Sequence, residues 1–315
     1  MPANLPIFPG IPAVNAGAGI STDYGTLIPP GSRVTYVRST GFQAGDPEAL
    51  NGRIFLTLAA GLAECRAGMN DYVFLLPGHT ESVTTPTALS ALVAGTRVIG
   101  IGNGSNRPVF RWTASGSQWA VAAADVTFSN LRLRTEGTVV AKAIAVTAAD
   151  VVFDSCEIEN SSGASNYATI CIEFGAGSAR GMVSNTRFRG LAAGTPANVV
   201  KLAGTLMDGV QIRSCSFICP GHATTGQIQI SVAATNFVIA DCVMYNTLAA
   251  SQFCVCIDAL AADGIISNVH MAVLNAGTAS AQGIFFGATS VVRCIQTFCV
   301  DEASKNGILA PAAGT

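Results

Sequence analysis

The stretch VVFDSCEIEN at residues 151–160 reappears in altered form as VQIRSCSFIC at residues 210–219. Each contains an apolar residue, a free position, a small polar residue, a cysteine, a free position and a second apolar residue. Related six-residue phrases begin at Phe128, Phe153, Val183, Ile212, Ile239 and Ile266, so their spacings are 25, 30, 29, 27 and 27 residues. A slipped last copy, VVRCIQTF, occupies 291–298, and another apolar strand falls between successive copies. A short period built only from β-prone segments predicts a solenoid whose stacked coils share one core.

The phrase fits two short strands joined by a sharp bend. Phe153, Cys156 and Ile158 are expected to point inward, and Asp154 outward. Asn and Asp tolerate the left-handed or turn conformations that such a bend requires, and Ser is a weaker version of the same choice. The predicted bend column is Asn130, Ser155, Asn185, Ser214, Asp241 and Asn268.

Two outward columns test this alignment. They contain Arg132, Glu157 and Arg187, with Arg134, Glu159 and Arg189 alongside. Neighbouring coils lie about 4.8 Å apart, so opposite charges are expected to meet across adjacent strands. The same alignment stacks Cys156, Cys215 and Cys242 in one inward column, which suits a small, commonly buried residue.

The pattern predicts an all-β fold, a parallel β-helix solenoid of roughly nine coils over residues 69–302. Residues 46–68 are predicted to form a capping helix, with Asp46 as N-cap, Pro47 at the first helical position and Gly68 as the stop. Residues 1–45 are expected to be an extended N-terminal arm with a lead-in strand, and residues 303–315 a C-terminal tail.

Composition excludes several classes of protein. Only 11% of the 315 residues are charged, 50% are hydrophobic, and the net charge is -2, which suggests that much of the surface is covered. No basic run or stripe supports nucleic-acid binding. No apolar segment approaches the roughly 18 residues of a membrane span, and the N-terminus lacks the regions of a signal peptide. Without a CxxC pair, the ten cysteines are expected to be reduced core residues of a protein made in a cytosol.

A resemblance adds to this interpretation. The segment TYVRSTG at 35–41 precedes the predicted helix, and DYVFLLPGHTE at 71–81 precedes irregular coils. Over roughly residues 33–300 this order resembles right-handed parallel β-helix proteins of the pectate-lyase-like class, in the form found in bacteriophage virion proteins. The resemblance implies the right-handed fold. It leaves function open, because the same fold serves tailspikes, polysaccharide lyases, adhesins and capsid-decorating proteins.

No catalytic, metal or cofactor site is expected. Glycosidases place two carboxyl groups about 5 to 10 Å apart. The closest acidic cluster is Asp154, Glu157 and Glu159, but both glutamates have arginine partners in the predicted ladders and Asp154 is expected to be solvated. Neither the Asp-Asp and Gly-His-Gly motifs of polygalacturonases nor an acidic cluster like the pectate-lyase calcium site is present. We therefore expect a protein that is not an enzyme.

Other candidate ligand groups give little support. His79, His222 and His270 fall in unrelated positions, so a metal site is not expected. The segment GNGSNRP at 102–108 lacks the Lys-Ser/Thr of a phosphate loop. Tyr and Trp, which often form sugar-binding platforms, number only five and two, and this counts against carbohydrate binding.

The leading hypothesis is a structural protein of a phage particle, a head decoration or cement protein. It would be synthesised in the host cytoplasm and sit on the capsid surface of the virion as a homotrimer or another symmetric oligomer. Its partners would be the major capsid protein or other virion proteins. The alternative is a receptor-binding tailspike or a polysaccharide depolymerase. A third hypothesis, a bacterial surface adhesin, is weakened by the missing export signal.

The outward columns also predict an interface. In later coils they change to Ser216, Val243 and His270, and to Ile218, Tyr245 and Ala272. Contiguous apolar patches on a soluble surface usually mark contacts. Ile218, Val243, Tyr245 and Ala272 are therefore predicted to lie between subunits, while the Arg–Glu end is more exposed.

Overall fold

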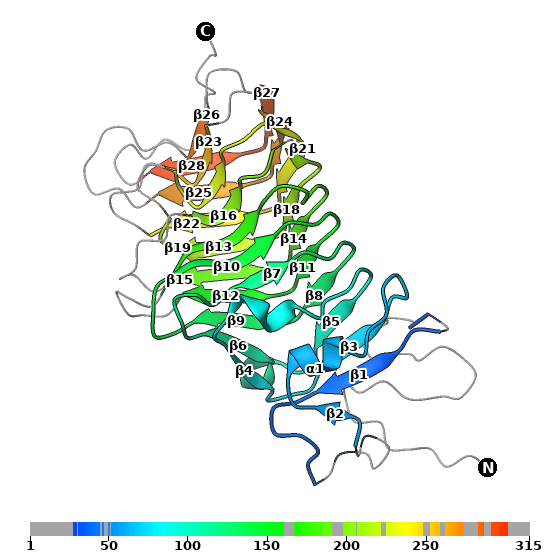
Figure 1. Ribbon diagram of the computed structural model, residues 1–315. Coiled ribbons are helices and arrows are strands. Elements are labelled where there is room, and N and C mark those ends of the chain that lie inside the picture. Colours follow the sequence, from blue (N-terminus) through cyan, green and yellow to red (C-terminus); the bar gives the residue numbers. More distant parts are fainter. Residues whose placement is uncertain are drawn as a thin grey trace, which may run out of the picture.

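The computed structural model describes residues 28–301 except 30, 45, 47–49, 51, 161–166, 191–197, 206, 222–224, 248–252, 259–261, 274–282 and 287–290. The chain winds into a parallel β-helix whose three walls are parallel sheets, here called sheets I, II and III (Figure 1). This arrangement confirms the predicted fold class and matches a right-handed parallel β-helix.

Each wall contains one strand from each of a series of successive coils. Sheet I runs in the order β2 (Ile54–Phe55), β1 (Val34–Val37), β3 (Tyr72–Leu75), β5 (Arg97–Gly100), β8 (Thr127–Ser129), β11 (Val152–Asp154), β14 (Met182–Ser184), β18 (Gln211–Arg213), β21 (Ala234–Ala240), β24 (Ala262–Ser267) and β27 (Val291–Ile295), with β17 (Met207–Asp208) beside β21. Sheet II comprises β4 (Thr80–Val83), β6 (Val109–Trp112), β9 (Arg132–Thr135), β12 (Glu157–Asn160), β15 (Arg187–Gly190), β19 (Ser216–Cys219), β22 (Val243–Asn246), β25 (His270–Val273) and β28 (Phe298–Asp301). Sheet III comprises β7 (Trp119–Val121), β10 (Val140–Val146), β13 (Ala168–Phe174), β16 (Asn198–Leu202), β20 (Ile228–Ile230), β23 (Val255–Ile257) and β26 (Ile284–Phe286).

The solenoid has seven complete turns rather than the nine expected. Only the turns from β5–β6–β7 to β24–β25–β26 contribute a strand to every sheet within the described residues. The turn that begins with β3 and β4 continues into a 3₁₀ helix at Pro86–Leu89 in place of a third strand. Counting corner phrases and apolar runs alone therefore overestimates the number of closed coils.

The corner between sheets I and II adopts the predicted conformation. All six predicted bend residues have a positive φ between 49° and 57°, and Gln296 of the slipped last copy follows with 48°. Each bend residue donates its backbone N–H to a carbonyl of the next coil, as Asn130 does to Asp154 at 3.0 Å and Ser155 to Ser184 at 3.0 Å. The corner thus needs a residue that tolerates the left-handed region, which explains the Asn, Asp and Ser of the phrase.

A second left-handed column lies at the corner between sheets III and I and was not predicted. It contains Asn70, Asp125, Asp150, Arg180 and Asn236, with φ from 52° to 58°, together with Gly95 and Gly209. The same backbone bond recurs here: the N–H of Asp150 donates to the carbonyl of Ala179 in the next coil at 3.0 Å. Because residue types in this column vary from Gly to Arg, no recurring sequence phrase indicates this corner.

The inward column after the bend explains the repeated cysteine. The Cys156 thiol lies 3.4 Å from the carbonyl oxygen of Asp154, and the Cys215 thiol 3.1 Å from that of Arg213. Thr186 occupies the same column and donates its hydroxyl to the Ser184 carbonyl at 2.9 Å. In these coils a small side chain with a donor fills the corner and binds a backbone oxygen, whereas Leu131 and Val269 fill the same column with apolar side chains. The nine cysteines whose side chains are described are free thiols.

The predicted capping helix is wrong in its extent. Helix α1 spans only Leu58–Leu62, and Thr57, rather than Asp46, is its N-cap. Asp46 instead forms an ion pair with Arg38, and Ile54 lies in β2, which pairs with β1. Leu50, Ile54, Leu58 and Leu62 recur every four residues, which is typical of a helix, but this spacing was produced by a strand and a short helix in succession. The short helix still covers the first coil, because Leu58 and Leu62 are buried in the main core.

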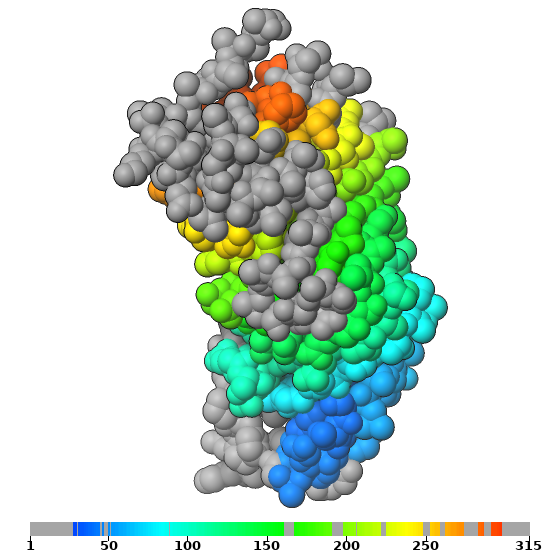
Figure 2. Space-filling view, turned by 90° about the vertical axis from the view of Figure 1, so that its left-hand side faces the viewer, coloured from blue at the N-terminus to red at the C-terminus, as the bar shows by residue number. Residues whose placement is uncertain are grey.

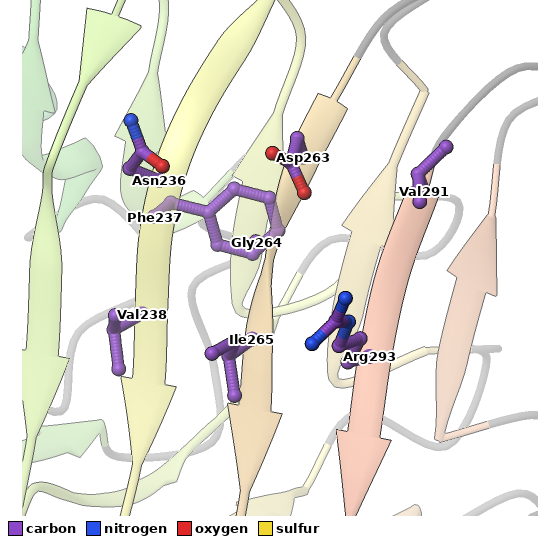
Figure 3. Close-up of a pocket in the computed structure, with 8 residues that line it drawn as sticks. All are labelled: Asn236, Phe237, Val238, Asp263, Gly264, Ile265, Val291 and Arg293. Carbon is purple, nitrogen blue, oxygen red and sulfur yellow. The ribbon is translucent and has the colours of Figure 1, made fainter.

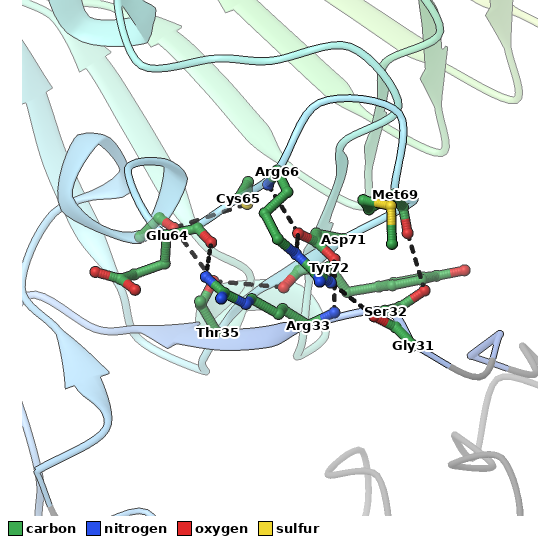
Figure 4. A network of polar contacts seen from close by, with 11 residues as sticks. Gly31, Ser32, Arg33, Thr35, Glu64, Cys65, Arg66, Met69, Asp71 and Tyr72 are labelled. Carbon is green, nitrogen blue, oxygen red and sulfur yellow. Dashed lines mark hydrogen bonds and ion pairs between the residues drawn. The ribbon is translucent and has the colours of Figure 1, made fainter.

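The N-terminal end carries a second apolar cluster, separate from the solenoid core. It contains Ile28, Tyr36, Leu50, Tyr72, Phe74, Leu76 and Ile101. Asp71 ties the same region together, because its buried carboxylate accepts hydrogen bonds from the Arg33 backbone N–H at 2.6 Å and from Arg66 (Figure 4). Described residues of the predicted arm thus pack against the β-helix. Residues 1–27 and the tail 303–315 lie outside the described residues.

Candidate functional site on the outer face of sheet II

The register of sheet II aligns the outward columns as predicted. Glu157 lies opposite Arg132 on β9 and Arg187 on β15, and Glu159 lies opposite Arg134 and Arg189. Figure 2 shows the successive coils stacked in sequence order, from blue at one end to orange at the other. The parallel ladder therefore places charged side chains of distant sequence segments on one flat wall.

The ion pairs run diagonally between coils instead of straight across. Arg132 contacts Glu159 at 2.6 Å, and Arg189 contacts Glu157 at 3.4 Å. This hydrogen bond with Glu159 raises the pKa of Arg132, which stays fully charged. Diagonal neighbours in a sheet are within reach of long side chains, so register alone did not determine the partner.

Three further charged residues complete the network and were missed from the sequence. Arg107 lies 3.9 Å from Glu157, while Glu136 contacts Arg134 at 3.1 Å and Arg111 at 3.7 Å. They stand outside the repeated phrase or in an early, irregular coil. The arginines at Arg107 and Arg111 have the even spacing of side chains on one face of a strand, as do those of β9. This spacing would have extended the outward columns towards the N-terminus.

The later coils place the predicted interface residues side by side. The register sets Ile218 opposite Tyr245 and Tyr245 opposite Ala272, and Val243 lies on the same strand as Tyr245. The exposed fractions are 42% for Ile218, 52% for Val243 and 38% for Tyr245, and Ala272 is half-buried. We call these four residues the apolar patch.

The acidic cluster considered for catalysis does not converge. Asp154 ends β11 on sheet I, whereas Glu157 and Glu159 lie beyond the corner on sheet II. Asp154 is half-buried, and it accepts hydrogen bonds from the hydroxyls of Ser155 and Ser184 and from the Asn185 amide at 2.6–2.9 Å. Asp154, expected to be a solvated outward residue, is half-buried and fastens the corners of adjacent coils through these hydrogen bonds.

The histidines lie apart. His79 is fully buried, and its Nδ1 accepts the Ser39 backbone N–H at 3.0 Å, while Nε2 lies 3.3 Å from Glu81. His270 is exposed on β25, and His222 falls outside the described residues. Within the described ranges, His, Cys, Asp and Glu form no group of three or more that could hold a metal ion. No described helix is long and apolar enough to span a membrane.

A shallow cavity of about 710 Å³ on the outer side of sheet I was not predicted. It is lined by Asn236, Phe237, Val238, Asp263, Gly264, Ile265, Val291 and Arg293. Figure 3 shows the Phe237 ring lying over Gly264, where an added Cβ would come within 2.5 Å of the ring. A glycine on β24 thus makes room for the buried aromatic ring of Phe237 from β21.

Comparison with known proteins places the fold. No family model matches the chain, and no curated protein matches it. Among solved structures, pectate lyase Pel9A superposes with a TM-score of 0.58 at 12% identity, covering 87% of this chain and 78% of that one. The fold is that of the pectate-lyase-like parallel β-helix. A putative glycosyl hydrolase from Parabacteroides merdae ATCC 43184 reaches only 0.24 at 11% identity, with 68% of this chain and 84% of that chain covered.

Proposed function

We propose that this protein is a non-enzymatic structural component of a bacteriophage particle. It decorates or cements the capsid as a symmetric oligomer, with a homotrimer as the expected state and the major capsid protein or other virion proteins as partners. The observation that supports this proposal is the apolar patch, in which Ile218, Val243 and Tyr245 are exposed together on a flat wall.

The patch has the chemistry of a subunit contact. Neighbouring strands in a sheet are about 4.8 Å apart, so these side chains form one continuous surface rather than scattered exposed residues. Contiguous exposed apolar surface in a soluble protein favours association, and closed symmetry is the usual outcome. This surface lies next to the charged network of sheet II. The subunit interface therefore has an apolar centre and a charged rim, as do many protein interfaces.

Light scattering of a double variant tests the contact. Val243→Glu with Tyr245→Glu places two carboxylates in the patch, which is costly enough in an apolar interface to dissociate the oligomer. The matched control is Ile265→Glu with Val291→Glu, which changes two exposed apolar residues on sheet I. If the first variant keeps the wild-type mass, or if only the control dissociates, the apolar patch is not the interface.

Location and activity are tested separately. A labelled antibody against the protein should bind intact virions of the phage that encodes it, and absence from purified virions would contradict the structural role. The second candidate, a receptor-binding tailspike or polysaccharide depolymerase, is favoured by the likeness of the fold to pectate lyase Pel9A. Incubation with host capsular polysaccharide separates the two, because clear depolymerisation would exclude a purely structural protein.

A further inference from the structure

The early half of the outer face of sheet II is a positively charged surface assembled from separate sequence segments. We call it the arginine face; it comprises Arg107, Arg111, Arg132, Arg134, Arg187 and Arg189 on or next to β6, β9 and β15. Three glutamates accompany these six arginines: Glu136, Glu157 and Glu159. The face therefore has an excess of three positive charges in a chain whose net charge is -2.

In each ion pair of this face the glutamate side chain is less exposed than its arginine partner. The Glu159 side chain is 11% exposed and that of Glu157 20%, against 50% for Arg189 and 41% for Arg111. Arg187 is also exposed, and no carboxylate in the described part of the chain lies within ion-pair distance of it. The glutamates thus hold the arginines from below, while the outer guanidinium edges keep donors available to another molecule.

The arginines are spaced to match an extended polypeptide. Arg132 and Arg134 are two residues apart on β9, as are Arg187 and Arg189 on β15. In an extended chain, alternate side chains also point to the same side, with nearly the same repeat along the strand. Within the protein, Glu157 and Glu159 alternate along β12 and form ion pairs with Arg189 of β15 and Arg132 of β9.

We propose that the arginine face binds an extended acidic peptide segment of another protein, in which carboxylate residues alternate along the chain. Arginine and carboxylate can form paired, charge-assisted hydrogen bonds, so the geometry favours carboxylates over neutral partners. Arginine is also enriched in protein interfaces, and the face continues directly into the apolar patch.

The same face is poorly suited to nucleic acid. Its outward positions on β6, β9, β12 and β15 carry no aromatic side chain on which bases could stack, and Tyr245 lies two strands beyond β15. Duplex DNA has about one charge per 1.7 Å of axis, and its tight binding needs more cations than this face supplies in excess. The scarcity of aromatic platforms also disfavours a sugar chain.

The proposal does not rest on the phage role, because it concerns purified protein and a synthetic peptide. The probe is a fluorescent alternating Glu-Thr decapeptide, measured by anisotropy at low ionic strength, with an alternating Gln-Thr decapeptide, a DNA duplex and a hyaluronan fragment for comparison. We expect binding of the Glu-Thr peptide that weakens with added salt, since exposed charges are screened. The Gln-Thr peptide should not bind.

Two variants locate the binding surface. Arg187→Gln with Arg189→Gln should weaken peptide binding at least about tenfold, because it removes two charge-assisted contacts. The matched control, Arg180→Gln with Arg293→Gln, removes two exposed arginines outside sheet II and should change affinity less than about twofold. Circular dichroism should show the β-sheet spectrum in both.

Several outcomes would overturn the proposal. They are the absence of Glu-Thr binding at low salt, equal losses in the two variants, or tighter binding of the DNA duplex or the hyaluronan fragment at matched total charge. The last result would identify a general polyanion surface rather than a peptide site. None of these outcomes bears on the oligomer mass or the virion location, so the proposed function stands or falls separately.

Discussion

Arg132 donates from Nη2 to Glu159 at 2.6 Å, although the residue opposite Arg132 in the strand register is Glu157. The coils therefore interlock by crossing ion pairs. Glu157 in turn contacts Arg189 from the following coil and Arg107 from an earlier one. One carboxylate thus links coils that have no direct strand pairing with each other.

The crossed pairing can be measured by double-mutant cycles. We expect the Arg132→Ala and Glu159→Ala cycle to give a coupling energy of about 0.5–1 kcal/mol, a modest value because Arg132 is partly exposed. The Arg134→Ala and Glu159→Ala cycle, which tests the register pair, should give a smaller value. Urea unfolding of the variants provides both numbers, and a larger coupling for Arg134 would contradict the crossed arrangement.

The bend column predicts which substitutions the corners accept. Ser214 has a φ of 53°, where a β-branched residue is strained, so Ser214→Val should lower the free energy of unfolding by about 1–2 kcal/mol. Ser214→Gly should be tolerated, because glycine enters the left-handed region without a steric penalty. Denaturant unfolding of the two variants tests this, and equal effects would argue against a conformational cause.

The buried thiols are expected to be reduced and unreactive. Burial, the largest cause, raises the pKa of Cys156 to about 12 and that of Cys171 to about 12. At pH 8 almost none of either thiol is the reactive thiolate, so alkylation should be slow until the protein unfolds. Cys294 is exposed and should react first. Intact mass with and without reductant provides a second check, and a deficit corresponding to two or more disulfides would contradict the assignment.

Asp71 should make the N-terminal end sensitive to acid. Burial alone would raise its pKa, but hydrogen bonds from the Arg66 side chain and from the backbone N–H groups of Arg33 and Arg66 outweigh it, so the pKa is lowered. The ionised group therefore stabilises the fold above the ordinary aspartate pKa of about 4, and this stability is lost as pH falls through the lower folded value.

The matching experiment compares Asp71→Asn with wild type across pH. The variant should be less stable at pH 7, and the difference should shrink below about pH 4, where the wild-type carboxylate begins to lose its advantage. Thermal unfolding followed by circular dichroism at several pH values measures the difference. A gap that stays constant down to pH 2 would mean that shape, and not charge, explains the effect.

The sequence predicted the parts of the molecule in which equivalent positions of successive coils share one physical requirement. The corner at Ser155 needs a positive φ and the position of Cys156 is buried in each of the six copies, so both left a readable phrase. The corner at Arg180 also requires a positive φ, but unrelated residue types occupy it in successive coils. No recurring sequence phrase therefore marks this corner. Helix α1 was overextended because Ile54 satisfied a helical spacing while pairing as a strand.

Side-chain partnerships at the candidate site were less predictable. The register opposite Glu157 followed from the phrase spacing, whereas its contacts with Arg107 and Arg189 depend on how long side chains cross between strands. The exposed positions of Ile218, Val243 and Tyr245 followed from simple alternation. The packing of Phe237 did not, because it depends on a missing side chain at Gly264 on the neighbouring strand.

The corner N–H groups give the solenoid a direction. Asn185 donates to Arg213, Ser214 to Ala240 and Asp241 to Ser267, always towards the C-terminus. Each of these coils therefore leaves a backbone donor that pairs with the coil that follows it. A protein shortened between Ser214 and Ala240 would keep its upstream coils but leave the backbone amide of Ser214, an exposed corner residue, to bind water, so the two ends of a shortened stack present different backbone groups.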